Sequence, residues 1–202
     1  MTLWRGKHPL ILASQSRARQ ILLANAGLNF ETVPAKIDER AIQQASGLST
    51  AGDIAALLAR EKALFVSAQR SGRYVIAADQ TLALGTQLLS KPTGRTSAAE
   101  QLHTLAGHRH ELYAAVAVAC DGKILFENVA MARMTMRRLM DAEIDAYLDQ
   151  AGAAVTSSVG AYQLEGLGVH LFERIEGDHF TILGLPLLPL LAFLRSERLL
   201  AI

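Results

Sequence analysis

The sequence predicts an α/β fold with a mixed sheet, antiparallel hairpins and flanking helices. Short apolar runs that suit buried strands alternate along the chain with segments whose apolar residues recur at helical spacing. Two dipeptides, Gly85-Thr86 and Asp121-Gly122, stand between strand-like runs and suit tight hairpin turns. Strands that alternate with helices favour parallel pairing, whereas hairpins require antiparallel pairing, so the sheet should contain both.

The first half of the chain begins with a strand, a serine turn and a helix. Residues 10–13 are wholly apolar, as in a buried strand, and residues 17–26 form a helical stretch that ends at a glycine. A second helix is expected over residues 51–69, because its apolar residues recur at helical intervals. The apolar residues 74–78 then predict a strand, with Asp79 at its carboxyl end.

The middle of the chain contains two predicted hairpins. The first joins residues 81–84 to residues 87–90, and the second joins residues 112–119 to residues 124–136. Between the hairpins, Ser97 with an acidic residue three positions later predicts a capping box near the start of a helix.

The last part of the chain combines helices with a long loop. A helix is expected over residues 141–150, followed by a Gly- and Ser-rich loop over residues 152–168 and a strand over residues 169–175. The apolar run 182–194 is interpreted as a buried strand end that leads into a core helix with Pro186 in its first turn. This run is shorter than a bilayer span and contains two prolines, so no membrane role is expected.

Composition favours one globular domain over residues 1–202. Half of the residues are hydrophobic and 19% are charged, which suits a packed core and excludes a disordered chain. The formal net charge of +1 gives no overall field that would hold nucleic acid, so any phosphate recognition has to be local. The single cysteine, Cys120, cannot form an intramolecular disulfide and stands beside apolar residues, so we expect a small buried hydrophobe in a cytoplasmic protein.

Ser14, Ser16 and Arg19 gather where the first strand is expected to pass into its helix. Hydroxyl groups beside unpaired helix N–H groups, with an arginine one turn further on, can hold an anion. The same residues occur where a serine simply caps a helix, so capping and anion binding both stay open. Asp38 and Glu39 also leave two interpretations, a solvated loop or helix start and a site for a hard divalent cation.

Asp79 and two lysines are the remaining candidates for chemistry. Asp79 follows an apolar run at the kind of strand terminus where α/β sheets commonly place ligands, although an aspartate there can also cap a turn. Lys62 lies within an apolar helix and Lys91 precedes a proline at the end of the first hairpin, so both can reach phosphate oxygens or extend into water. The sequence has no zinc-ligand spacing, phosphate-binding glycine loop or serine nucleophile elbow.

Five segments follow one another in an order that is more specific than any one of them. They are LASQSRARQILL at 12–23, IDE at 37–39, REKA at 60–63, VIAAD at 75–79 with KP at 91–92, and GAYQLEGLG at 160–168 running on to GLP at 184–186. Taken together, these segments closely resemble the motifs of the Maf family of nucleotide pyrophosphatases. The resemblance covers residues 10–195, which is nearly the whole chain.

The resemblance implies an elongated, two-lobed fold of the Maf/ITPase type with a central cleft. It also implies hydrolysis of a nucleoside triphosphate between the α- and β-phosphates, which gives a nucleoside monophosphate and pyrophosphate with the help of a divalent cation, Mg²⁺ or Mn²⁺. Asp79 falls on the position of the catalytic proton acceptor, and Glu39 and Asp79 on those of the metal ligands. The positions implied for substrate binding are Ser14, Arg19, Lys62, Lys91 and Gln163. A homodimer is expected by the same likeness.

Three further positions bear on the choice of base. Ala18 stands where the branch acting on dTTP and UTP typically has an arginine, Gln80 where it has a threonine, and Glu165 where it has a glutamine. Gln80 and Glu165 resemble the branch acting on 7-methyl-GTP, as does VHLFERIEG at 169–177, although Ala18 departs from the bulky residue expected there. A carboxylate at Glu165 can accept hydrogen bonds from the N1–H and amine of a guanine edge. The alternatives are the same reaction on dTTP and UTP, and a nucleotide-binding regulator of cell division.

Overall fold

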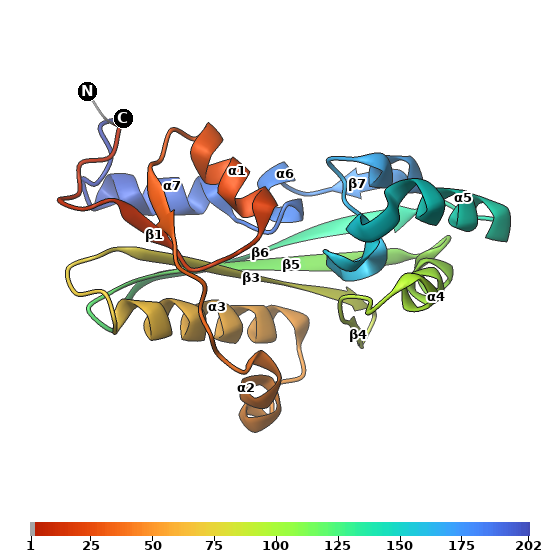
Figure 1. Cartoon of the computed structure of the whole chain (residues 1–202), viewed down its shortest axis with the longest axis horizontal. Coiled ribbons are helices and arrows are strands. Elements are labelled where there is room, and N and C mark those ends of the chain that lie inside the picture. Colours follow the sequence, from red (N-terminus) through yellow and green to blue (C-terminus); the bar gives the residue numbers. More distant parts are fainter. Residues whose placement is uncertain (1–2) are drawn as a thin grey trace.

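A computed structural model describes residues 3–202, and within that range the chain forms a seven-stranded mixed sheet flanked by helices (Figure 1). The strands are β1 (Leu10–Leu12), β2 (Phe30–Thr32), β3 (Val75–Leu84), β4 (Gln87–Leu89), β5 (Arg109–Cys120), β6 (Lys123–Met136) and β7 (Phe172–Glu176). The α-helices are α1 (Arg17–Asn25), α2 (Glu39–Ser46), α3 (Ala51–Ser67), α4 (Arg95–Leu105), α5 (Asp141–Ala151), α6 (His179–Ile182) and α7 (Leu187–Ser196). Between α5 and β7 lie the 3-10 helices η1 (Gly152–Thr156), η2 (Val159–Ala161) and η3 (Leu167–Leu171).

The sheet contains both kinds of strand pairing, which confirms the predicted fold class. Its strand order is β2-β1-β3-β5-β6-β7, with β4 paired to β3. The short β1 runs parallel to both β2 and β3, whereas the other pairs are antiparallel. In Figure 1 the long strands β3, β5 and β6 run along the long axis of the molecule and give it the expected elongated shape.

Two apolar clusters divide the molecule into two lobes on the same sheet. One cluster packs α1 and α7 against the sheet and includes Leu12 and Leu190. The other packs α4 and α5 against its far end and includes Leu102 and Ile144. Because both clusters draw residues from β3, β5 and β6, a continuous sheet connects the lobes.

Asp79 lies in the middle of β3, so the prediction that it ends a strand is wrong. The ladder to β5 continues without a break from Val75 to Ala83, and it extends the strand beyond the polar residues. On the other edge of β3, the pairing with β1 ends at Ile76 and the pairing with β4 starts at Leu82. Asp79 therefore stands beside a gap between two short neighbouring strands, and this gap positions the site.

Several local predictions also need correction. The helix predicted to begin at Ser97 starts two residues earlier with Gly94 as its N-cap, and the Ser97 hydroxyl accepts the Gly94 N–H. The loop over residues 152–168 contains 3-10 helices, and η3 delays the following strand to Phe172. Cys120 is half-buried at the end of β5, because its strand leaves the core there.

The run near Ile182 is the end of α6 and a turn, where a buried strand end was predicted. Gly184, with φ +85°, makes this turn possible, since an L side chain rarely adopts that backbone conformation. Helix α7 follows with Pro186 as its N-cap. Within residues 3–202, none of the helices has both the length and the apolar character needed to cross a bilayer.

Candidate active site

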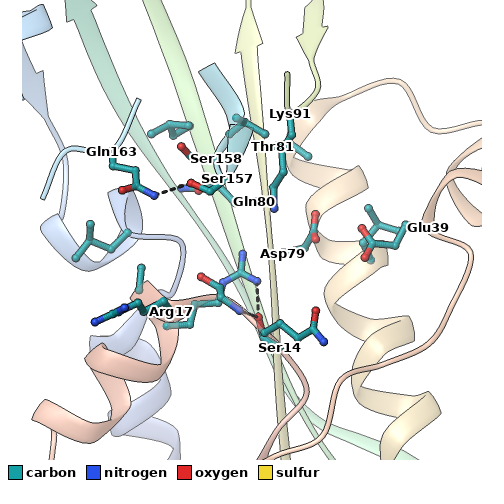
Figure 2. A pocket seen from close by; sticks show the side chains of 18 of the residues that line it. Ser14, Arg17, Glu39, Asp79, Gln80, Thr81, Lys91, Ser157, Ser158 and Gln163 are labelled. Carbon is teal, nitrogen blue, oxygen red and sulfur yellow. Dashed lines mark hydrogen bonds between the residues drawn. The ribbon is translucent and has the colours of Figure 1, made fainter. Parts of the chain in front are cut away.

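A cleft of about 990 Å³ lies between the lobes, and it is the size of a typical small-molecule site. Figure 2 shows side chains from both lobes facing it. Asp38, which was considered with Glu39 for a cation site, does not line the cleft; it caps α2, where its Oδ1 accepts the Ala41 N–H. Every residue for which the family resemblance implied a role does line the cleft. They are Ser14, Ala18, Arg19, Glu39, Lys62, Asp79, Gln80, Lys91, Gln163 and Glu165.

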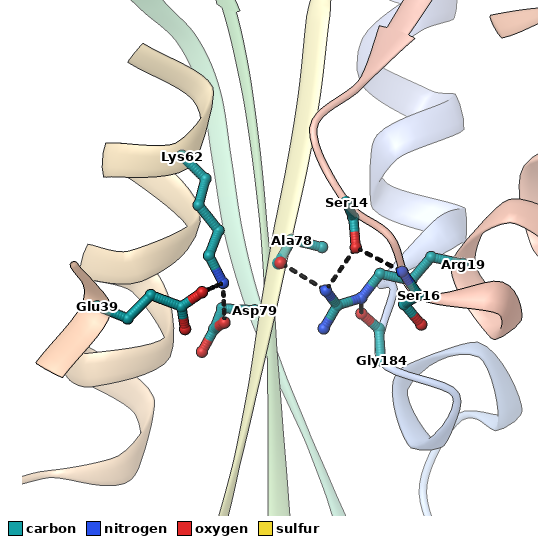
Figure 3. A network of polar contacts seen from close by, with 8 residues as sticks. All are labelled: Ser14, Ser16, Arg19, Glu39, Lys62, Ala78, Asp79 and Gly184. Carbon is teal, nitrogen blue, oxygen red and sulfur yellow. Dashed lines mark hydrogen bonds and ion pairs between the residues drawn. The ribbon is translucent and has the colours of Figure 1, made fainter. Parts of the chain in front are cut away.

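One side of the cleft carries two carboxylates that share a lysine, and we call Glu39, Lys62 and Asp79 the acidic wall. Lys62 Nζ lies 2.6 Å from Asp79 Oδ1 and 2.9 Å from Glu39 Oε1 (Figure 3). Lys62 and Asp79 are each 8% exposed, so this pair is removed from water. The structure thus excludes the alternative in which Lys62 extends into solvent.

Small residues explain how the lysine of α3 reaches the acid of β3. Strand residues alternate between the two faces of a sheet, so Ala77 and Asp79 both face α3. The contact between this helix and the sheet is made largely by alanines, namely Ala55, Ala59 and Ala63 with Ala77, Ala115 and Ala117. Helix and sheet can approach closely there, and the stem of Lys62 runs along the interface to the cleft.

Burial shapes the charge of the acidic wall. The pKa of Asp79 is raised above its ordinary value, chiefly because burial disfavours the carboxylate. The cations of Lys62 and Arg19 oppose that rise. A carboxylate with a raised pKa accepts a proton more readily than an ordinary aspartate, which suits a general base.

On the opposite face of β3, Arg19 connects three parts of the chain (Figure 3). Its Nη1 donates to the Ala78 carbonyl at 2.7 Å and to Ser14 Oγ at 3.1 Å, and its Nε donates to the Gly184 carbonyl at 2.8 Å. The Ala78 carbonyl lies in the gap beside β3, so the guanidinium takes the place of a missing strand partner. Burial lowers the pKa of Arg19, and the charges of Asp79 and Glu39 raise it.

Ser14 does not cap α1; its hydroxyl holds the turn before the helix and the Arg19 side chain together. Its Oγ accepts the Ser16 N–H at 3.2 Å as well as the Arg19 bond. Ser16 is the N-cap residue, and among the described residues it makes no side-chain cap hydrogen bond. The first turn of α1 therefore presents N–H groups near the cleft, next to Ala18.

The wall opposite the acidic wall is a loop, and we call residues 157–165 the loop wall. Gln163 Nε2 donates to Ser157 Oγ at 2.6 Å, and Glu165 also lines the cleft. Figure 2 shows Gln163 and Ser157 across the cleft from Glu39 and Asp79. This loop was predicted without internal structure, and its serines were missed because their sole signal was a Gly- and Ser-rich composition.

Gln80 and Lys91 occupy the part of the cleft near β4. Gln80 Nε2 donates to the carbonyls of Thr181 and Ile182, which holds α6 against β3. Lys91 is exposed just beyond β4 and lines the cleft, where it is free to approach a bound anion. Thr81, which the sequence analysis did not single out, also lines the cleft and donates to the Ala51 carbonyl at 2.8 Å.

The acidic wall suits a divalent cation that also binds phosphate. Two carboxylates from α2 and β3 already converge on one positive charge, the Lys62 ammonium, through Oδ1 of Asp79 and Oε1 of Glu39. Across residues 3–202, no cluster of three or more His, Cys, Asp or Glu side chains could hold a metal ion by itself. This donor set fits Mg²⁺, which usually takes one or two carboxylates and completes its shell with water and substrate phosphates.

Sequence comparisons with known proteins extend over nearly the whole chain. Residues 9–197 match the family described as Maf-like protein. A nucleoside triphosphate pyrophosphatase of Bradyrhizobium diazoefficiens is 70% identical over 202 residues, which covers 100% of both chains. Nucleoside triphosphate pyrophosphatase 1 of Jannaschia sp. is 49% identical over 95% of this chain and 98% of its own. A solved structure, a HAM1 protein from Coxiella burnetii, aligns with a TM-score of 0.45 and 16% identity over 65% of this chain and 74% of its own.

Proposed function

The chain belongs to the Maf-like protein family, and on that premise we propose that it is a metal-dependent nucleoside triphosphate pyrophosphatase. The reaction splits the bond between the α- and β-phosphates and gives a nucleoside monophosphate and pyrophosphate. The proposed preferred substrate is 7-methyl-GTP or another modified nucleotide. The observation that carries this proposal is the acidic wall, in which the buried Asp79 and the exposed Glu39 share Lys62 at the edge of a cleft lined by cations.

Asp79 acts as the proton acceptor. One water is consumed in each turnover: its oxygen bonds to phosphorus, the bridging P–O bond breaks, and a proton passes to the Asp79 carboxylate. The raised pKa of Asp79 favours this transfer, because it brings the basicity of the carboxylate closer to that of neutral solution. Lys62 holds the carboxylate in place through its contact with Oδ1.

Cations around the cleft balance the charge of the triphosphate. Lys91 can approach the phosphates from β4, and the N–H groups at the start of α1 can accept an anion. Glu39 and Asp79 would hold the divalent cation, which supplies charge neutralisation for the phosphates and a lower pKa for the attacking water. Arg19 organises this region by fixing Ser14 and the Gly184 turn against β3.

The loop wall supports the choice of base. Glu165 is a carboxylate across the cleft from the acidic wall, and it can accept two hydrogen bonds from a guanine edge. N7-methylation makes the guanine base cationic, so a nearby carboxylate favours the methylated form. A carboxamide at the same position would offer neither the charge nor two equivalent acceptors.

A panel of triphosphates tests the function. Purified protein is incubated with 7-methyl-GTP, GTP, dTTP or UTP in Mg²⁺, in Mn²⁺ or in excess chelator, and pyrophosphate is measured. We expect pyrophosphate release that depends on the cation, with the highest kcat/KM for 7-methyl-GTP. Higher values for the pyrimidines would overturn the role of Glu165, and nucleotide binding without pyrophosphate from any substrate would favour a nucleotide-binding regulator.

A further inference from the structure

A histidine beneath the loop wall is hydrogen-bonded to a tyrosine of that wall, in the core of the second lobe. His110 Nε2 lies 2.8 Å from the hydroxyl of Tyr162. The two side chains are 1% and 4% exposed, and the ring of Phe172 packs against both. His110 comes from β5 and does not line the cleft, so the proposed chemistry gives it no role.

The loop wall needs support because its backbone is unfavourable. Gly160 has φ +79° and Ala161 has φ +62°, and the second of these is costly for a residue with a Cβ. Hydroxyl groups brace this turn: Tyr147 Oη donates to the Ala161 carbonyl, and Ser158 Oγ donates to the Tyr162 carbonyl. Such a conformation persists when its surroundings fix it.

Tyr162 connects this support to the cleft. Its backbone is extended, with φ −135° and ψ 156°, and neighbouring side chains of an extended segment point in opposite directions. The Tyr162 ring belongs to the apolar cluster of the second lobe, so Gln163 is directed into the cleft. A shift of the Tyr162 backbone would carry Gln163, its neighbour in the chain, and would bear on Glu165 two residues further.

We propose that His110 is a positioning residue, which holds Tyr162 and thereby sets the position of Gln163 and Glu165 in the loop wall. Burial lowers the pKa of His110 to about 4 and raises that of Tyr162, so both groups are neutral near pH 7. A neutral imidazole and a phenol can form one hydrogen bond in either direction, without a buried charge. Among residues 3–202, no partner meets His110 Nδ1 with good hydrogen-bond geometry, and the His108 backbone acts on the ring only weakly, so the bond to Tyr162 is the well-formed hydrogen bond of this ring.

A matched set of variants tests the inference. His110→Gln can place its amide near the position of Nε2, whereas His110→Asn has a shorter side chain that places its amide near Nδ1. Tyr162→Phe removes the hydroxyl and keeps the ring. Steady-state kinetics with the best nucleotide and hydrogen exchange of residues 157–165 are measured for each variant, at a temperature where circular dichroism shows it to be folded.

We expect KM to rise about tenfold in His110→Asn and in Tyr162→Phe, with kcat changed far less, because misplaced binding groups weaken substrate positioning. His110→Gln should stay near the wild-type KM, and the His110→Asn/Tyr162→Phe double variant should be no worse than either single variant. Exchange in residues 157–165 should accelerate in the affected variants. The proposal would be overturned if KM and exchange stayed unchanged in His110→Asn and Tyr162→Phe. It would also be overturned if the rise in KM of the double variant equalled the product of the two single rises.

The kinetic part of this test rests on the proposed function, whereas the exchange part does not. If the wild-type chain hydrolyses no nucleotide, the proposed function fails and hydrogen exchange alone decides the inference. Faster exchange in His110→Asn than in His110→Gln would then support the positioning of the loop by His110. Equal exchange in the two variants would contradict it.

Discussion

The acidic wall stands on regular secondary structure, whereas the loop wall that faces it has no strand and no α-helix. Lys62 and Asp79 come from the middle of α3 and β3, and an alanine-rich contact holds these two elements together. Gln163 and Glu165 come from a loop that depends on the side-chain hydroxyls of Tyr147, Ser158 and Tyr162. The comparison suggests a division of tasks, with proton transfer on rigid elements and base selection on a segment that can vary without disturbing the sheet.

The largest expected effect concerns proton transfer at the acidic wall. Asp79→Asn keeps the shape of the side chain and removes the proton acceptor, so kcat should fall about 10³-fold, as is typical for loss of a general base. Nucleotide binding, measured by calorimetry in the presence of the cation, should be retained. Asp145→Asn, the same change at an exposed site on α5, is the control and should keep the wild-type rate. A rate within tenfold of the wild type in Asp79→Asn would remove this residue from the mechanism.

The burial of the ion pair in the acidic wall predicts a large loss of stability when Lys62 is removed. Lys62→Met leaves Asp79 buried beside Glu39 without its cation, and breaking a buried ion pair in this way costs about 4 kcal/mol. Urea unfolding measures the loss. Arg60 lies on the same helix as Lys62 and forms an exposed ion pair with Glu127 of β6. Arg60→Met breaks this pair and should cost about 0.5 kcal/mol. Similar losses for the two variants would show that burial of the acidic wall contributes little.

The support beneath the loop wall predicts a loss of stability in acid. Unfolded His110 has its ordinary pKa of 6.5, and burial lowers that pKa to about 4 in the folded chain. Between these values the unfolded chain binds the proton and the folded chain does not. Stability is therefore present above pH 6.5 and falls by about 3 kcal/mol as the pH approaches 4, since one pKa unit corresponds to about 1.4 kcal/mol.

Urea unfolding of the wild type and of His110→Gln at a series of pH values isolates this contribution by difference. The variant should lack this part of the pH dependence, whereas a variant at the exposed His103 should keep it. If the free energies of unfolding of the wild type and His110→Gln changed in parallel with pH, a neutral buried His110 would be contradicted.

The smallest expected effect is a change of preference at the loop wall. Glu165→Gln should reduce kcat/KM for 7-methyl-GTP about tenfold while changing the value for UTP much less, because a charged acceptor is replaced by a neutral one. The ratio of the two kcat/KM values is the measurement. An unchanged ratio would show that another group selects the base.

The sequence predicts the acidic wall better than its surroundings. Lys62 and Asp79 could be chosen because each carries a charge within or beside an apolar segment, and local patterns reveal such residues. Glu39 stands in a polar context, and it was the resemblance to the family motifs that gave it a role. The place of Asp79 within its strand could not be predicted, because the pairing with β5 that extends β3 involves residues far along the chain. For the same reason the short elements β2 and α6 were not predicted, since tertiary contacts and not local pattern decide them. Helix α2 begins at Glu39 with Asp38 as its N-cap, which agrees with the helix start that was one of the two interpretations of this pair.

The partners of the site residues were also beyond local patterns. Arg19 binds the Gly184 carbonyl across 165 positions of sequence, and His110 meets Tyr162 across 52. Neither partner carries a charge that would single it out in the sequence. The segment 152–168, which contains the loop wall, was predicted as unstructured because the 3-10 helices η1, η2 and η3 are too short for a periodic signal. The order of the loop wall itself comes from side-chain hydroxyls.

The separation of tasks between the two walls can be tested by the nucleotide preference of the Asp79→Asn variant. At high enzyme concentration, its residual kcat/KM is measured for 7-methyl-GTP and for UTP. We expect both values to fall together, so that their ratio stays within about twofold of the wild-type ratio, because distant sites act independently. A ratio that collapses towards one would show that the acidic wall also selects the base, and it would contradict the division between the walls.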